Sequence, residues 1–305
     1  MNQPKKILLQ TTIPTAEQDW SIARFSKLAA HLREQRDDEG NPLYDVTARD
    51  RDPSAQPDSV LSTIDKSDFD QLWLLAVDSG DGLTKEDCDA ISAFRRGGRG
   101  LLVTRDHMDL GSSLCTLGGI GQAHYFHSRH QDPDPQRNQR DDPYTTAISW
   151  PNYHSGANGD YQEIEVVGEP HAVLANERSP TGSIRYLPSH PHEGGIGVPD
   201  GEDARVILKG RSKVTGKEFN IAVVFEPGEG GGPAIAESTF HHFADYNWDP
   251  DSSCPSFVGE PPSDGLKRFP EALADTRRYV LNIASWLSGR QQVLVRDTFA
   301  GRELA

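Results

Sequence analysis

Four short apolar runs in the first third of the chain are typical of buried β-strands. They are separated by polar segments and cover residues 6–11, 44–48, 71–77 and 100–104. Two segments between them have the apolar spacing of helices: residues 17–34, and residues 84–96, where Thr84 and Asp87 stand at capping-box distance. Strand and helix signals that alternate in this way predict right-handed crossovers, hence an α/β fold with a mainly parallel sheet and helices on both faces.

Regular patterns return in the last third. Residues 205–210 and 219–225 predict a hairpin, residues 234–240 a final strand, and residues 273–287 a terminal helix. The long stretch between the two regions, residues 105–199, has little periodicity but holds most of the eleven histidines and several aromatic residues. We interpret it as ordered loops over the carboxyl ends of the strands, where parallel sheets bind ligands.

Length and composition narrow the classes of partner. The 305 residues suit one α/β domain over residues 1–288, with an insert at 250–270 and a peripheral tail at 289–305. The net charge of −15 argues against nucleic acid and anionic membranes. No apolar run is long enough for a signal peptide or a membrane span, and the three cysteines are isolated. These features predict a cytoplasmic protein with a small-molecule ligand, and they leave a homo-oligomer open.

The first candidate site residues follow the fourth strand. Asp106 and His107 stand where a tight turn after a strand can aim side chains at a ligand, and we predict catalytic roles for both. The alternative is that these polar residues cap the next helix. Further on, His124 and His127 would share one face of a helix and form a metal-binding pair, or else they are loop histidines bonded to their neighbours.

A second group of candidates lies in the segment His190-Pro191-His192-Glu193. Two imidazoles and a carboxylate within four residues suit a metal site or an acid–base pair. We therefore predict His190 and His192 as metal ligands and Glu193 as a catalytic carboxylate.

The segment from His241 to Asp249 follows the predicted last strand directly. His241 and His242 are candidate metal ligands, although neighbouring side chains point in different directions, so at most one is expected to face the site. Asp245 is a candidate catalytic carboxylate. The alternative is a polar turn with packed aromatic residues.

Substrate-binding candidates are residues that offer hydrogen bonds or aromatic faces to a sugar. In the segment after His242 they are Tyr246, Asn247 and Trp248, and in the polar segment 150–160 they are Asn152, His154 and Asn158. The polar segment is equally consistent with a tightly turned loop.

Several common motifs are missing. The chain has no Gly-x-Gly-x-x-Gly after its first strand, no phosphate-binding loop ending in Gly-Lys-Ser/Thr, no Gly-x-Ser-x-Gly and no His-Glu-x-x-His. We therefore expect no nucleotide cofactor and no serine hydrolase chemistry. The cofactor that the histidines and carboxylates could hold is a divalent metal such as zinc, manganese or iron.

The order of these features resembles the ThuA-like (trehalose-utilisation) family of the class I glutamine amidotransferase-like superfamily. The segments that carry the resemblance are residues 69–75, 83–84, 97–103 leading to His107, 121–127, 239–245 and 284–287. The chain departs from the family pattern at Phe240, where glycine usually precedes the histidine, and in the insert 250–270. The resemblance implies a flavodoxin-like sheet and a role around sugars, in some members with a divalent metal.

The superfamily's glutaminase chemistry needs a cysteine at the turn after the strand, since a thiolate is the nucleophile. That turn holds Asp106 and His107, and Cys115 lies well beyond it, which argues against a glutaminase. We expect instead an enzyme that hydrolyses, isomerises or deprotonates a sugar-like or other polyhydroxylated molecule. The alternative is a non-catalytic protein of the same fold that binds a carbohydrate or a partner. Both interpretations require positions 107, 192 and 241 to converge above the sheet.

Overall fold

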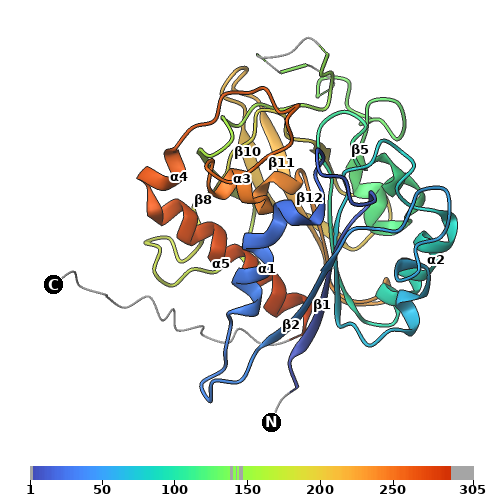
Figure 1. Cartoon of the computed structure of the whole chain (residues 1–305). Coiled ribbons are helices and arrows are strands. Elements are labelled where there is room, and N and C mark those ends of the chain that lie inside the picture. The colour runs from blue at the N-terminus through green and yellow to red at the C-terminus, as the bar shows by residue number, and fades with distance from the viewer. Residues whose placement is uncertain (1–2, 138–139, 142, 144–146, 290–305) are drawn as a thin grey trace.

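The computed structural model describes residues 3–137, 140–141, 143 and 147–289, so the predicted tail lies almost entirely outside the described residues. Within them, the main sheet has eight strands in the order β2-β1-β3-β4-β12-β11-β10-β7 (Figure 1). Their bounds are β1 (Lys5–Thr11), β2 (Tyr44–Arg49), β3 (Gln71–Leu75), β4 (Gly100–Thr104), β7 (Glu165–Val166), β10 (Ala204–Arg211), β11 (Glu218–Phe225) and β12 (Ala234–Glu237). The first five strands in this order, β2, β1, β3, β4 and β12, are parallel. Strands β11, β10 and β7 extend the sheet in antiparallel pairs.

Helices cover both faces of this sheet, because alternate residues of each strand point to opposite sides. Ile7 and Leu9 pack in one core with α1 (Ser26–Arg33) and α5 (Pro270–Leu287). Leu8 belongs to a second core that is covered by α2 (Lys85–Arg96) (Figure 1). The sequence prediction of helices on both faces is therefore confirmed.

Short elements complete the fold, mostly within the long middle stretch. The remaining helices are η1 (Ile22–Phe25), η2 (Leu61–Lys66), η3 (Ser112–Thr116), η4 (Gly119–Ala123), η5 (Ala172–Leu174), η6 (Phe240–Phe243), α3 (Asp245–Trp248) and α4 (Gly265–Arg268). Two small antiparallel sheets pair β5 (His124–Tyr125) with β9 (Gly195–Ile196) and β6 (Tyr161–Glu163) with β8 (Tyr186–Pro188). No helix among the described residues is long and apolar enough to cross a bilayer.

Two predicted boundaries were wrong. The helix expected over 17–34 begins as an α-helix only at Ser26, after the 3₁₀ turn η1. The strand expected over 234–240 ends at Glu237, and the chain then turns into η6, whose first turn is capped by the Thr239 hydroxyl accepting the backbone N–H of His241 at 3.2 Å. This early end of β12 places the two histidines in η6.

The capping box predicted at the start of α2 is present. The Thr84 hydroxyl accepts the backbone N–H of Asp87 at 3.2 Å, and the Asp87 carboxylate accepts the backbone N–H of Thr84 at 3.0 Å. Because these bonds satisfy N–H groups that the helix itself leaves free, we predict that Thr84→Ala lowers the free energy of unfolding by about 1 kcal/mol. Urea denaturation would measure this, with exposed Ser256→Ala as a control that leaves stability unchanged. An unchanged midpoint for Thr84→Ala would contradict the prediction.

Candidate metal centre

Asp106 and His241 meet because their strands are neighbours. Strands β4 and β12 are parallel and paired so that Thr104 stands beside Glu237. Asp106 follows Thr104 by two residues, and His241 follows Glu237 by four after the turn into η6. A backbone hydrogen bond of 2.8 Å from Phe240 to the carbonyl of Arg105 joins the two turns. Their side chains consequently converge at the carboxyl end of the sheet, as the topology predicts.

The third member of the group comes from the loop between β8 and β9. His190 Nε2 lies 3.4 Å from Asp106 Oδ1, and His241 Nε2 lies 3.5 Å from Asp106 Oδ2. One donor atom from each residue lies within 4.8 Å of the others, and all three residues are at most 3% exposed. We call Asp106, His190 and His241 the triad.

Two asparagine side chains determine which ring nitrogen of each histidine carries a proton. His190 Nδ1 lies 3.0 Å from Asn158 Oδ1, and His241 Nδ1 lies 2.8 Å from Asn247 Oδ1. The Asn247 amide nitrogen donates to Asn158 Oδ1 at 2.7 Å, so both oxygens are acceptors. Each Nδ1 therefore donates to an asparagine oxygen, and each Nε2 is turned toward Asp106. This is how outer amides and carbonyls orient histidines that bind metals.

Burial and the neighbouring side chains shift the pKa values of two residues of the triad. Burial by itself would raise the pKa of Asp106, but the three adjoining imidazoles hold it well below its usual range. Burial, followed by the charge of His241, keeps the pKa of His190 well below its usual range, so that ring is neutral. The two triad rings stack with centroids 3.5 Å apart, and His190 Nε2 makes no hydrogen bond within the described residues. Two imidazole nitrogens and one carboxylate form a donor set that fits a divalent metal.

Two further histidines flank the triad. His107 Nδ1 lies 2.9 Å from Asp106 Oδ2, and the His107 side chain is 20% exposed. The ring of His192 packs edge-on against both His107 and His190. The residues predicted at 107, 192 and 241 therefore do come together, and the rings of His192 and His241 are buried.

Glu260 is a neighbour of the site that the sequence analysis did not identify. Its Oε1 lies 2.7 Å from His192 Nε2, and the hydrogen bond to His192 lowers the pKa of Glu260. Glu260 belongs to the insert 250–270, which had been noted only as a departure from the family pattern. No local motif marks it, and only the path of the insert over the site brings it there.

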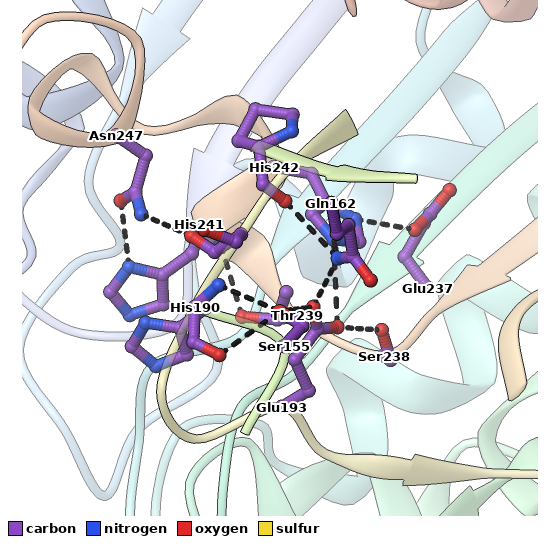
Figure 2. A network of polar contacts seen from close by, with 12 residues as sticks. Ser155, Gln162, His190, Glu193, Glu237, Ser238, Thr239, His241, His242 and Asn247 are labelled. Carbon is purple, nitrogen blue, oxygen red and sulfur yellow. Dashed lines mark hydrogen bonds and ion pairs between the residues drawn. The ribbon is translucent and has the colours of Figure 1, made fainter. Parts of the chain in front are cut away.

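Glu193 and His242 lie close to each other and beside His190 and His241 (Figure 2), and their contacts differ from the roles predicted for them. His242 stands between two carboxylates, with Nδ1 3.1 Å from Glu237 Oε2 and Nε2 3.5 Å from Glu193 Oε2. Burial opposes the charged ring, but Glu193 and Glu237 together raise the pKa of His242 to about 10. With both nitrogens protonated, His242 cannot bind a metal. The expectation that the two adjacent histidines point in different directions is confirmed.

Asp245 was predicted as a catalytic carboxylate, but it caps a helix. It accepts the backbone N–H groups of Ser26 at 3.0 Å and Lys27 at 2.8 Å, and also the Ser26 hydroxyl. Carboxylates are favoured at helix N-termini because they pair with free N–H groups and with the helix dipole. A carboxylate from far along the chain thus begins α1 at Ser26, which explains why the sequence signal placed this helix start too early.

The aromatic and polar substrate candidates mostly support the fold. Trp248 Nε1 donates to the carbonyl of His242 at 2.8 Å, and Trp248 and Tyr246 are both buried, so neither presents a face to a sugar. Asn152 accepts the backbone N–H of Asp141, which fixes its own loop. His154 is buried, and its backbone N–H donates to Asp141 Oδ2. Asn247 and Asn158, also predicted to bind substrate, instead orient the triad histidines.

The proposed pair of His124 and His127 does not form. The segment begins with the short strand β5 and is not helical, so the two rings do not share a helix face. Burial, assisted by the charge of Arg105, lowers the pKa of His124 to about 3. His127 Nδ1 lies 3.2 Å from the carbonyl of Trp150. Neither histidine belongs to the triad.

No protein-family model matches the chain, and no curated protein matches its sequence. Solved structures are similar to it in three dimensions. A ThuA-like protein from Parabacteroides merdae is 13% identical with a TM-score of 0.54, over 95% of this chain and 93% of that one. The mmIFT52 N-terminal domain is 10% identical with a TM-score of 0.50, over 92% and 97% of the two chains. The glutaminase domain of Trypanosoma brucei CTPS has a TM-score of 0.48 at 12% identity, over 95% and 96%.

At these identities the similarity concerns the fold alone. It confirms the predicted α/β architecture with its mainly parallel sheet, and it shows that a ThuA-like protein has a similar fold.

The new role of Asp245 is testable. We predict that Asp245→Ala lowers the free energy of unfolding by about 1–2 kcal/mol, because two helix N–H groups lose their acceptor, and leaves metal binding at the triad unchanged. Urea denaturation and calorimetric Zn²⁺ titration would measure the two effects. Asp251→Ala, which removes an exposed carboxylate paired with Lys267, serves as the control. Loss of metal binding in Asp245→Ala would contradict the prediction and would support a role for Asp245 at the triad.

Proposed function

We propose that this protein is a metal-dependent hydrolase of a sugar-like, polyhydroxylated small molecule, with the triad as its divalent-metal site. The observation that carries the proposal is the pair of Nε2 atoms that lie 3.4 and 3.5 Å from the oxygens of one buried carboxylate. Three protein donors leave at least one coordination position free, which is the pattern of catalytic metal sites. Among the described residues, no fourth His, Cys, Asp or Glu completes the group.

A metal bound in such a site supplies Lewis acidity and lowers the pKa of water. The chain's own residues then position and move protons. His107 Nδ1 lies 2.9 Å from Asp106 Oδ2, on the more exposed side of the site. His192 donates Nε2–H to Glu260. Each imidazole is oriented by a carboxylate, an arrangement that suits a general base and a general acid.

The substrate class rests on charge and on the insert above the site. A net charge of −15 disfavours anionic substrates. Phe257 in the insert is 62% exposed, three residues before Glu260. An exposed aromatic ring offers a face for stacking on a sugar. These features support a neutral, hydroxyl-rich molecule.

The alternative is a non-catalytic protein that uses the same metal site to bind a carbohydrate or a partner. The near-complete burial of the triad favours it, since structural metal sites are closed. The free coordination position and the two flanking imidazoles favour the enzyme. Turnover distinguishes the two.

The metal site is tested by titrating metal-stripped protein with Zn²⁺ or Mn²⁺. We predict about one equivalent bound, and at least about 100-fold weaker binding in Asp106→Asn and His241→Asn, because losing a ligand exceeds the ~10–100-fold effect typical of outer partners. His127→Asn, which removes a histidine outside the triad, should bind as the wild type does. Equal affinity in all four proteins would contradict the proposal.

Catalysis is tested with the metal-loaded protein on acetylated monosaccharides and 4-nitrophenyl glycosides. We predict that His107→Asn lowers kcat/KM by about 10²–10⁴-fold, the range for a general acid or base, while its metal affinity stays within a few-fold of wild type. His31→Asn, on α1 far from the triad in sequence, is the control. Metal binding without turnover of any substrate would favour the non-catalytic alternative.

A further inference from the structure

The Glu193 side chain joins four segments of the chain behind the triad (Figure 2). Its Oε1 accepts the Ser155 hydroxyl at 2.7 Å and the side-chain amide of Gln162. Its Oε2 accepts the Ser238 hydroxyl at 2.8 Å and lies 3.5 Å from His242 Nε2. Glu193 is completely buried, so all of its acceptor capacity is directed at these four groups.

One side of this arrangement holds His190. The Ser155 hydroxyl that donates to Glu193 also accepts the backbone N–H of His190 at 2.9 Å, and the Ser155 N–H donates to the carbonyl of His190 at 3.0 Å. Gln162, which donates to Glu193, also donates to the carbonyl of Pro188 at 3.2 Å, two residues before His190. The backbone around His190 is therefore held by two partners of Glu193, Ser155 and Gln162.

The other side holds His241 and Asp106. Ser238 stands three residues before His241, and its carbonyl accepts the backbone N–H of Gly194 at 3.1 Å. Between them, the Thr239 hydroxyl donates to Asp106 Oδ1 at 3.0 Å. His242, the fourth partner of Glu193, directly follows His241. The turn that presents the second histidine is thus attached to the same carboxylate as the first.

The side chains around Glu193 are connected to the core of the fold. His242 is fixed from its far side by Glu237 on β12, and Glu237 accepts the hydroxyl of Tyr279 from α5. All three side chains are completely buried. These contacts therefore connect the loops that carry His190 and His241 to strand β12 and helix α5 of the core.

We infer that Glu193 is a positioning residue, which sets the distance and orientation of His190 and His241 and thereby the affinity of the triad for a divalent metal. The inference rests on the proposed metal site. It assigns Glu193 no contact with the metal or the substrate. The oxygens of a carboxylate accept hydrogen bonds, which suits the four groups that converge on this side chain.

The test is Glu193→Gln, which keeps the size of the side chain but places an amide NH₂ against donor groups. With Zn²⁺ or Co²⁺ alone as the probe, we expect binding about 10–100-fold weaker than wild type, the effect of losing an outer partner of a ligand. The visible absorption bands of bound Co²⁺ should also change, because they report ligand geometry. Affinities are measured by competition with a chelator well below the unfolding temperature.

The matched control is Asp58→Asn. Asp58 is also a completely buried carboxylate, and it accepts bonds from Arg49 and from the backbone of Asp52, Val60 and Leu61, outside the triad. The Asp58→Asn substitution should lower the unfolding temperature and leave the Zn²⁺ affinity and the Co²⁺ spectrum unchanged. If Glu193→Gln does not fold, Ser155→Ala, which removes only the hydroxyl, should weaken binding in the same direction.

The outcomes separate the two proposals. Zn²⁺ binding by the wild type together with wild-type affinity and spectrum in Glu193→Gln or Ser155→Ala would overturn the role of Glu193 and leave the metal site standing. Failure of the wild type to bind either metal would overturn the metal site and this inference with it. Equal loss of affinity in Asp58→Asn would show a general effect of destabilisation and would also overturn the inference.

Discussion

Two imidazole Nε2 atoms face one buried carboxylate, and the rest of the site is arranged around that contact. Asparagine oxygens occupy the Nδ1 atoms of His190 and His241, so each ring turns its Nε2 toward Asp106. Electrostatic energies are large in a buried site of low dielectric. A cation held between two imidazole nitrogens and a carboxylate would be attracted to all three. This is the physical basis of the metal site proposed above.

The residues around the triad form layers at increasing distance from it. The asparagines choose the tautomers, and Glu193 with its serine partners holds the loops that carry the rings. Glu237 and Tyr279 then connect this layer to the core. On the opposite side, His107 and the pair of His192 and Glu260 form the more exposed edge of the site. Polar groups that would be costly to bury singly are satisfied because each layer supplies acceptors for the donors of the next.

The same layering explains why a polar segment can look functional without touching a ligand. Asn158, Asn247 and Glu193 are as well placed in the sequence as the triad itself, and all were predicted to act on substrate. In the structure, Asn158 and Asn247 bond to the triad histidines, and Glu193 bonds to the segments that carry them. Their residue types are those of an active site because orienting a histidine and binding a substrate both need hydrogen-bond acceptors.

The sequence by itself determined the order and type of the main elements and the edge of the sheet at which the site lies. Periodicity identifies β1, β3, β4 and α2, since apolar spacing is a local property, and parallel strands send the residues after them to one edge. The sequence also drew attention to Asp106, His190 and His241, but alongside His124, His127 and His242, which the same local signals mark equally. Only the tertiary structure decided among them, because the protonation and aim of a histidine depend on partners such as Asn158 or Glu237 from distant segments. Glu260 and the capping role of Asp245 likewise arise from contacts between segments far apart in the chain, and no local pattern records such contacts.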